Sequence, residues 1–133
     1  MPANPDALSL IGFTLLVGKL QQFHHLSASF RVAGMQPPAQ VHGIVFNSIK
    51  SNVDIDVPKM RMQFRINQFK NQGRVGRDCR IFDAQVRDAI VVRRAVTLGL
   101  PVGLVGNVKQ EDSVRDDYTI VAQELLDTPV SII

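Results

Sequence analysis

The stretch MRMQFRINQF, residues 60–69, constrains the fold most, because apolar and polar side chains alternate in it over eight successive positions. One set is apolar and consists of Met60, Met62, Phe64 and Ile66; the other is polar and consists of Arg61, Gln63, Arg65 and Asn67. Successive side chains of an extended strand point to opposite faces. The alternation therefore predicts a β-strand with one face in the core and one face of arginines and amides in solvent.

Further strands are expected on both sides of this stretch. Apolar or alternating residues predict strands at 8–18, 26–32, 41–50, 79–88 and 89–106. The first of these could also form a short helix. Segments 41–50 and 60–69, separated by a turn region, are expected to pair as a hairpin.

The pattern changes to a helical period near the end of the chain. Ser113 is a candidate N-cap with Asp116 three residues on, and the helix is expected to end before Thr128–Pro129. The apolar stripe of this helix, predicted over 113–127, consists of Val114, Tyr118, Val121 and Leu125.

These elements predict an α+β fold for a single domain, residues 1–133: an antiparallel β-sheet of about five to seven strands followed by a C-terminal helix. One helix cannot cover such a sheet, so apolar area would stay exposed in a monomer. We therefore expect a homodimer that completes the fold, with the helix stripe in the dimer interface.

The composition narrows the classes of protein to which the chain can belong. With 45% hydrophobic and 20% charged residues, it has the composition of a globular domain. No apolar run reaches the ~20 residues of a membrane span, and the first ten residues lack the features of a signal peptide, so a cytoplasmic protein is expected. Cys79 is the only cysteine, which excludes an internal disulfide.

The positive charge is concentrated in one part of the sequence. Residues 59–94 hold ten cations against three aspartates, whereas residues 1–58 are neutral and residues 95–133 carry a net charge of −4. A local excess of this kind is typical of a surface that meets a polyanion. The alternative is a solvated sheet face followed by an arginine-rich loop.

No motif indicates catalysis, a metal or a cofactor. His24 and His25 are adjacent, and neither His42 nor Cys79 stands at a metal-binding spacing. Ser113 lies in no nucleophile-elbow motif, and the glycine-rich stretches lack the lysine and hydroxyl of a P-loop. We therefore expect a binding or structural protein and no enzyme.

The order of the predicted elements resembles that of the coat proteins of small single-stranded RNA bacteriophages. MRMQFRINQF is similar to the cationic strand of that family, VVRRAVTLGL to the strand after its loop, and QELLDTPVSII to its helix and apolar tail. The resemblance implies dimers that assemble into an icosahedral capsid around genomic RNA, in a virion formed in the bacterial cytoplasm. It also implies binding of an RNA hairpin as a translational repressor.

The resemblance assigns roles to individual residues. The expected RNA-binding residues are Arg61, Gln63, Arg65, Asn67, Arg93, Thr97, Asn47 and Lys50. Arg74, Arg77 and Cys79 fall in an expected inter-subunit loop, where Cys79 could crosslink neighbouring subunits. The alternative function is a single-stranded nucleic-acid-binding module of the OB type. The expected burial of Phe64 counts against it, because such modules stack bases on exposed aromatic rings.

Overall fold

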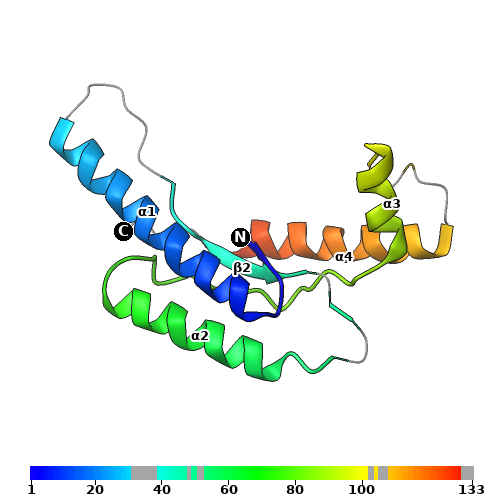
Figure 1. The fold of residues 1–133 in the computed structure, drawn as a ribbon, viewed down its shortest axis with the longest axis horizontal. Coiled ribbons are helices and arrows are strands. Elements are labelled where there is room, and N and C mark those ends of the chain that lie inside the picture. The colour runs from blue at the N-terminus through cyan, green and yellow to red at the C-terminus, as the bar shows by residue number, and fades with distance from the viewer. Residues whose placement is uncertain (31–38, 48, 51–52, 102–103, 105–107, 130–133) are drawn as a thin grey trace.

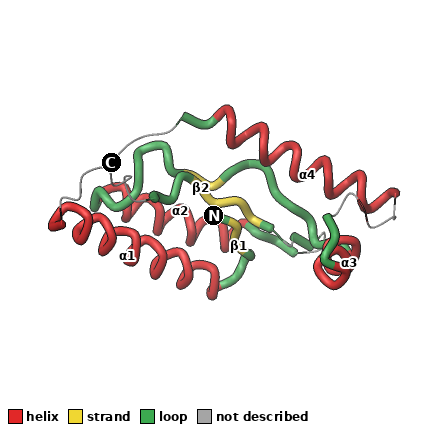
Figure 2. The backbone as a smooth tube through the Cα atoms, turned by 90° about the horizontal axis from the view of Figure 1, so that it is seen from above, coloured by secondary structure: helices red, strands yellow, loops and turns green. Residues whose placement is uncertain are grey.

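The computed structural model describes residues 1–30, 39–47, 49–50, 53–101, 104 and 108–129. Within them the elements follow the order β1 (Pro2–Ala3), α1 (Ala7–Phe30), β2 (Gly43–Phe46), α2 (Asp56–Asn71), β3 (Arg80–Ile81), α3 (Ile90–Leu98) and α4 (Val108–Asp127). Figure 1 shows the strands at the centre, α1 and α2 beside them, and α3 standing apart at one end of α4. Seen from above, α1 and α4 lie on opposite sides of the strands (Figure 2).

The sheet is parallel, which corrects the expected fold class. Its order is β1-β2-β3, with Ala3 paired to Phe46 and Ile44 paired to Ile81. Helices α1 and α2 are the crossovers between successive strands, as a parallel sheet requires. The described chain is thus an α/β structure of three short strands and four helices, and the expected antiparallel sheet of five to seven strands is wrong.

Residues 60–69 belong to helix α2, so the predicted strand and its hairpin with 41–50 are also wrong. Positions 62 and 66 share a face in a strand, but they also share a face in a helix, and with Phe69 they form the buried stripe of α2. The segment is rich in Met, Arg and Gln, which favour helices, and Ile66 is its only β-branched residue. Residue composition therefore decides between two periods that both fit the core positions.

Helix α1 replaces the strands expected at 8–18 and in the first part of 26–32; residues 31 and 32 lie outside the described residues. Asp6 caps the helix, because its Oδ1 accepts a hydrogen bond of 2.8 Å from the Ser9 N–H. Phe13 and Val17 are buried, and the Phe13 ring meets the Phe69 ring of α2 edge to face at 5.4 Å. This contact joins the two crossover helices over the sheet.

The first part of the stretch expected as a long strand at 89–106 forms helix α3 instead, and residues 102, 103, 105 and 106 lie outside the described residues. The helix ends at Gly99, which adopts a φ of 64°, while the Leu100 N–H bonds to the Ala95 carbonyl. A glycine in this left-handed conformation is a common helix stop. Its capping interactions outweigh the strand preference of the β-branched residues, and Ala95 is buried.

Three sequence expectations are confirmed in part. Residues 43–46 of the segment 41–50 form strand β2, and the predicted strand at 79–88 contains β3 near its start. Helix α4 contains the predicted helix 113–127 and ends at Asp127 as expected. It begins earlier, at Val108, so Ser113 lies within the helix and the prediction of an N-cap there is wrong. The alternating side chains of β2 divide its two faces, with Ile44 and Phe46 in the core.

Candidate nucleic-acid interface

The exposed side of α2 carries an aromatic ring among cationic and amide side chains. Arg61, Phe64, Arg65 and Gln68 stand at positions i, i+3, i+4 and i+7, which are neighbours on one helix face; we call these four residues the α2 surface. The Phe64 side chain is 71% exposed, and Arg65 donates a hydrogen bond of 3.0 Å to Gln68. The α2 surface thus presents an uncovered ring beside two guanidinium groups.

The end of α2 places a third arginine near this surface. Gly73 has a φ of 68°, its N–H bonds to the Lys70 carbonyl, and the Arg74 N–H bonds to the Phe69 carbonyl. These two bonds form a Schellman motif, which brings the residue after the glycine back onto the last helical turn. The Arg74 guanidinium consequently lies 5.8 Å from the centre of the Phe69 ring, and that of Arg65 lies 6.0 Å from the same ring.

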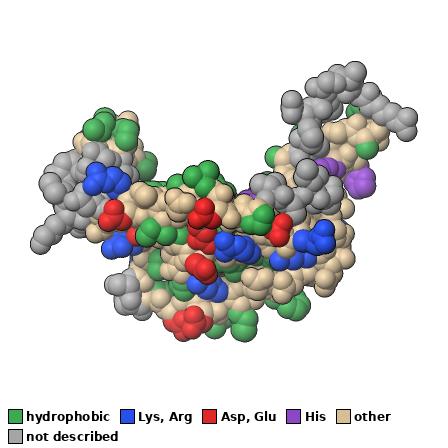
Figure 3. All heavy atoms as spheres, turned by 180° about the vertical axis from the view of Figure 1, so that it is seen from behind, with side chains coloured by type: hydrophobic (Ala, Val, Ile, Leu, Met, Phe, Trp, Pro, Cys, Tyr) green, Lys and Arg blue, Asp and Glu red, His purple; other side chains and the backbone are tan. Residues whose placement is uncertain are grey.

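Within the described part of the chain, the cations of α2 form no ion pair. The ion pairs that join described residues to each other are Arg80–Glu124, Arg87–Asp117 and Arg93–Asp88, and none of these involves α2. The basic side chains of α2 and the loop after it are Lys59, Arg61, Arg65, Lys70, Arg74 and Arg77. On the face seen in Figure 3, by contrast, basic and acidic side chains lie close together across the middle of the molecule.

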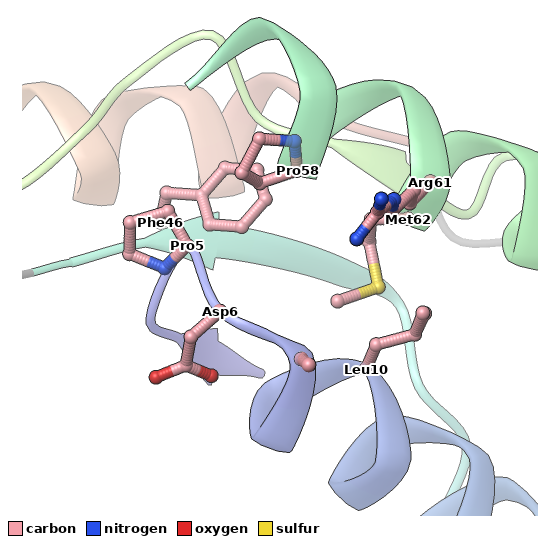
Figure 4. A pocket seen from close by; sticks show the side chains of 8 residues that line it. Pro5, Asp6, Leu10, Phe46, Pro58, Arg61 and Met62 are labelled. Carbon is pink, nitrogen blue, oxygen red and sulfur yellow. The ribbon is translucent and has the colours of Figure 1, made fainter. Parts of the chain in front are cut away.

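Arg61 also borders a small cavity at the carboxyl ends of β1 and β2, between the first turns of α1 and α2 (Figure 4). Ligands of open α/β sheets often bind at such an edge. This cavity has a volume of about 240 Å³, below the ~300 Å³ of typical ligand pockets, and its lining is mostly apolar, as Leu10, Phe46 and Met62 illustrate. It is best explained as a packing gap between the two helices.

Gln63 and Asn67 do not share a face with the arginines as the strand prediction required. They lie two residues further along α2, on roughly the opposite side of the helix at ~100° per residue, where Gln63 donates a hydrogen bond of 2.9 Å to Asn67. Gln63 borders a shallow depression with Lys59 and Phe82. The four predicted residues of 60–69 are therefore divided between two sides of one helix.

The remaining predicted RNA-binding residues lie on other elements. Arg93 and Thr97 are exposed on α3, where Arg93 pairs with Asp88 at 2.9 Å. Lys50 is exposed beyond β2, whereas Asn47 follows β2 directly and lines a groove beneath α4. The structure thus brings Arg61 and Arg65 together and leaves these four apart from them.

Among the residues expected in a dimer interface, Tyr118, Val121 and Leu125 line the same groove as Asn47, and Val114 is fully buried within the chain. The dimer itself stays a prediction. In the expected inter-subunit loop Arg74 and Arg77 are exposed, but Cys79 is only 1% exposed and burial raises the pKa of its thiol. A crosslink through Cys79 would require this segment to open.

The sequence patterns did not reveal the polar contacts that attach α4 to the segment after β3. Glu124 accepts hydrogen bonds from the Arg80 side chain and from the backbone N–H groups of Asp83 and Ala84, each at 2.8 Å. Asp117 accepts two from the Arg87 guanidinium, at 2.8 and 2.9 Å. Local charge patterns in the sequence cannot predict these pairs, because the two members of each pair are 30 to 44 residues apart.

The pKa values of the Asp117 and Glu124 carboxyl groups are both shifted from their usual values. Burial raises the pKa of Asp117, but the hydrogen bonds and charge of Arg87 outweigh it, so the pKa is lowered overall. The pKa of Glu124 is lowered in the same way by its backbone and Arg80 contacts, against the effect of burial. Both groups are therefore ionised structural acceptors at neutral pH.

No group of three or more potential metal ligands occurs among the described residues, and no described helix is long and apolar enough to cross a membrane. Comparison with protein-family models, with curated proteins and with solved structures gave no significant match. Function is accordingly inferred from the geometry of the site.

Proposed function

We propose that the chain binds single-stranded nucleic acid through the α2 surface. The observation that carries this proposal is the exposure of Phe64, at 71%, between Arg61 and Arg65. Proteins that bind single strands combine cations that track the phosphates with exposed aromatic rings that stack on bases. The α2 surface offers both within two helical turns.

The electrostatics of the region support the same ligand. Arg65 and Arg74 both lie near the Phe69 ring, so two positive charges are kept close together without an acidic neighbour that pairs with them among the described residues. Like charges at short range repel, and phosphate groups relieve this repulsion. A polyanion thus suits this surface better than a neutral partner does.

The corrected fold bears differently on the two functions expected from the sequence, a capsid protein and a single-stranded nucleic-acid-binding module. The expected burial of Phe64 opposed a stacking mode of binding, and its exposure on α2 removes that objection. Shell assembly and hairpin repression relied on a resemblance to an antiparallel fold, which the parallel sheet does not support. The proposal therefore concerns nucleic-acid binding alone.

The test compares Phe64→Ala with Phe23→Ala in fluorescence anisotropy measurements on a short labelled oligouridine. Phe23 is a matched control, because it is a phenylalanine that is 60% exposed but lies on α1, outside the α2 surface. Stacking is worth ~1–3 kcal/mol per base, so Phe64→Ala is expected to weaken binding at least fivefold, whereas Phe23→Ala leaves it unchanged. Equal affinities for the two variants would contradict the proposal.

Two controls accompany this comparison. Both side chains are exposed, so each variant should keep its unfolding free energy within about 0.5 kcal/mol of the wild type. A duplex of the same length should bind more weakly than the single strand, because its bases are already stacked on one another. Tighter binding to the duplex would point to recognition of the backbone alone.

A further inference from the structure

A groove lies on the face of the sheet opposite α1 and α2. Val45 and Phe82 contribute to its lining from the sheet side, and Tyr118, Val121 and Leu125 line it from α4. Its volume of about 480 Å³ falls within the ~300–1,000 Å³ of small-molecule sites. The α2 surface belongs to a helix that packs with α1, so this groove is separate from the proposed nucleic-acid interface.

The groove exists because α4 covers only part of its side of the sheet. Glu124 and Asp117 attach α4 to the segment that follows β3, at one side of the sheet. Pro2 of β1 and Val45 of β2 therefore line an open space beside the helix. Parallel sheets usually have both faces covered, so this part of the face can accept an occupant.

Two of the residues that line the groove each have a buried polar atom that no described residue pairs with. His42 Nε2 and Asn47 Oδ1 are buried atoms without a hydrogen-bond partner among the described residues, and both residues line the groove. Leaving a buried acceptor or donor unpaired costs ~1–3 kcal/mol. The two residues are separated by the length of β2, or about 16 Å of extended chain at ~3.3 Å per residue.

We propose that this groove binds an elongated, largely apolar small molecule that carries a hydrogen-bonding group at each end. Its body contacts the apolar side chains of α4 and the sheet, one end donates a hydrogen bond to Asn47 Oδ1, and the other pairs with His42 Nε2. An amphipathic helix of a second copy would match the shape of the groove. Its apolar face would leave both polar atoms unpaired, however, so the small molecule is the better occupant.

The test uses 4,4′-dihydroxybiphenyl, a rigid rod with a hydroxyl group at each end, and biphenyl as the apolar control. Tyr118 is the only tyrosine of the chain, so the ring signal of tyrosine-labelled protein reports on the groove by NMR. Each hydrogen bond is worth ~0.5–1.5 kcal/mol, so the diol is expected to bind at least threefold more tightly than biphenyl. Asn47→Leu and His42→Phe should each reduce this preference while biphenyl binding persists.

Val121→Trp is the blocking variant, because a larger side chain at this position fills the groove, and it should abolish the response to both probes. Equal affinities for the diol and biphenyl, or no change at Tyr118 with either probe, would overturn the proposal. A Tyr118 signal that instead shifts with protein concentration, together with a dimer in sedimentation, would also overturn it and assign the groove to a second copy. These outcomes are independent of RNA binding by α2.

Discussion

The expected burial of Phe64 depends on whether its segment is a strand or a helix. In an alternating strand it belongs to the apolar face, but in α2 it lies on roughly the opposite side of the helix from the buried Met62, Ile66 and Phe69. A helix of this length buries one stripe against the sheet, and an apolar side chain outside that stripe stays in solvent. Its exposure beside Arg61 is therefore a property that the sequence pattern alone did not predict.

The cations beside Phe64 lead to a prediction on salt dependence. If Arg61 and Arg65 each neutralise one phosphate, the double variant Arg61→Ala/Arg65→Ala should reduce the slope of log K against log salt by about 1.4 on a single strand. Titrations of oligouridine at several salt concentrations measure this slope. Lys19→Ala/Lys50→Ala, which changes two exposed lysines outside α2, should leave the slope unchanged. A slope that is identical in both double variants and the wild type would mean that the arginines are only solvated.

Gly73 provides a second prediction at the scale of a residue. Its φ of 68° is strained for a residue with a Cβ, so Gly73→Ala should destabilise the fold by about 1 kcal/mol and disturb the position of Arg74. Urea unfolding measures the first effect and RNA affinity the second. Gly12→Ala is the control, because Gly12 lies within α1 and a Cβ there meets no neighbouring atom within 4 Å. Unchanged stability and affinity in Gly73→Ala would contradict the role given to the Schellman motif.

At the scale of elements, the sequence predicted α4 and β2 but not α2 or α3. The helical stripe of α4 includes buried Val114 and has no competing alternation, so one period fits it. In α2 positions 62 and 66 satisfy both periods, and in α3 the cap at Gly99 outweighs the strand preference of its β-branched residues. The ion pairs that attach α4 join segments far apart in the sequence, and local sequence patterns cannot predict contacts of this kind.

The Arg87–Asp117 pair predicts how stability depends on pH. The folded-state pKa of Asp117 is lowered, so its contribution is present above the unfolded pKa of about 3.9 and is lost as the pH falls through the folded pKa. Asp117→Asn should cost about 1–2 kcal/mol at pH 7, because the Arg87 side chain is 55% exposed and the pair is partly screened. It should also flatten the loss of stability below pH ~4.

Urea unfolding at neutral and acidic pH measures both effects of Asp117→Asn. Asp116→Asn serves as the control, because Asp116 is an exposed neighbour on the same helix. An equal loss of stability in the two variants would show that helix charge, and not the pair with Arg87, is responsible.

At the scale of the molecule, the parallel sheet with helices on both sides replaces the expected antiparallel sheet. The sequence indicated strands correctly where an apolar run was short, as in β2, and failed where longer apolar runs were helices, as in α1. Helix α1 carries apolar side chains on two opposite sides: Phe13 and Val17 are buried, whereas Leu8, Leu15 and Phe30 are each more than 60% exposed on the other side. Because apolar residues are not confined to one side of α1, its sequence shows no clear helical period.

This architecture predicts a far-UV circular dichroism spectrum dominated by helix. The described residues contain two helices of 20 residues or more and no strand longer than four residues. A spectrum dominated by β-structure would contradict the fold and would restore the antiparallel expectation.

Photocrosslinking tests whether the α2 surface contacts the bases of a single strand. An oligonucleotide that contains 5-iodouridine is bound to the wild-type protein and irradiated, and the modified peptide is identified by mass spectrometry. We expect the crosslink to form on Phe64 and to be lost in Phe64→Ala. A crosslink on Tyr118 or on another aromatic residue, with Phe64 unmodified in the bound complex, would contradict it.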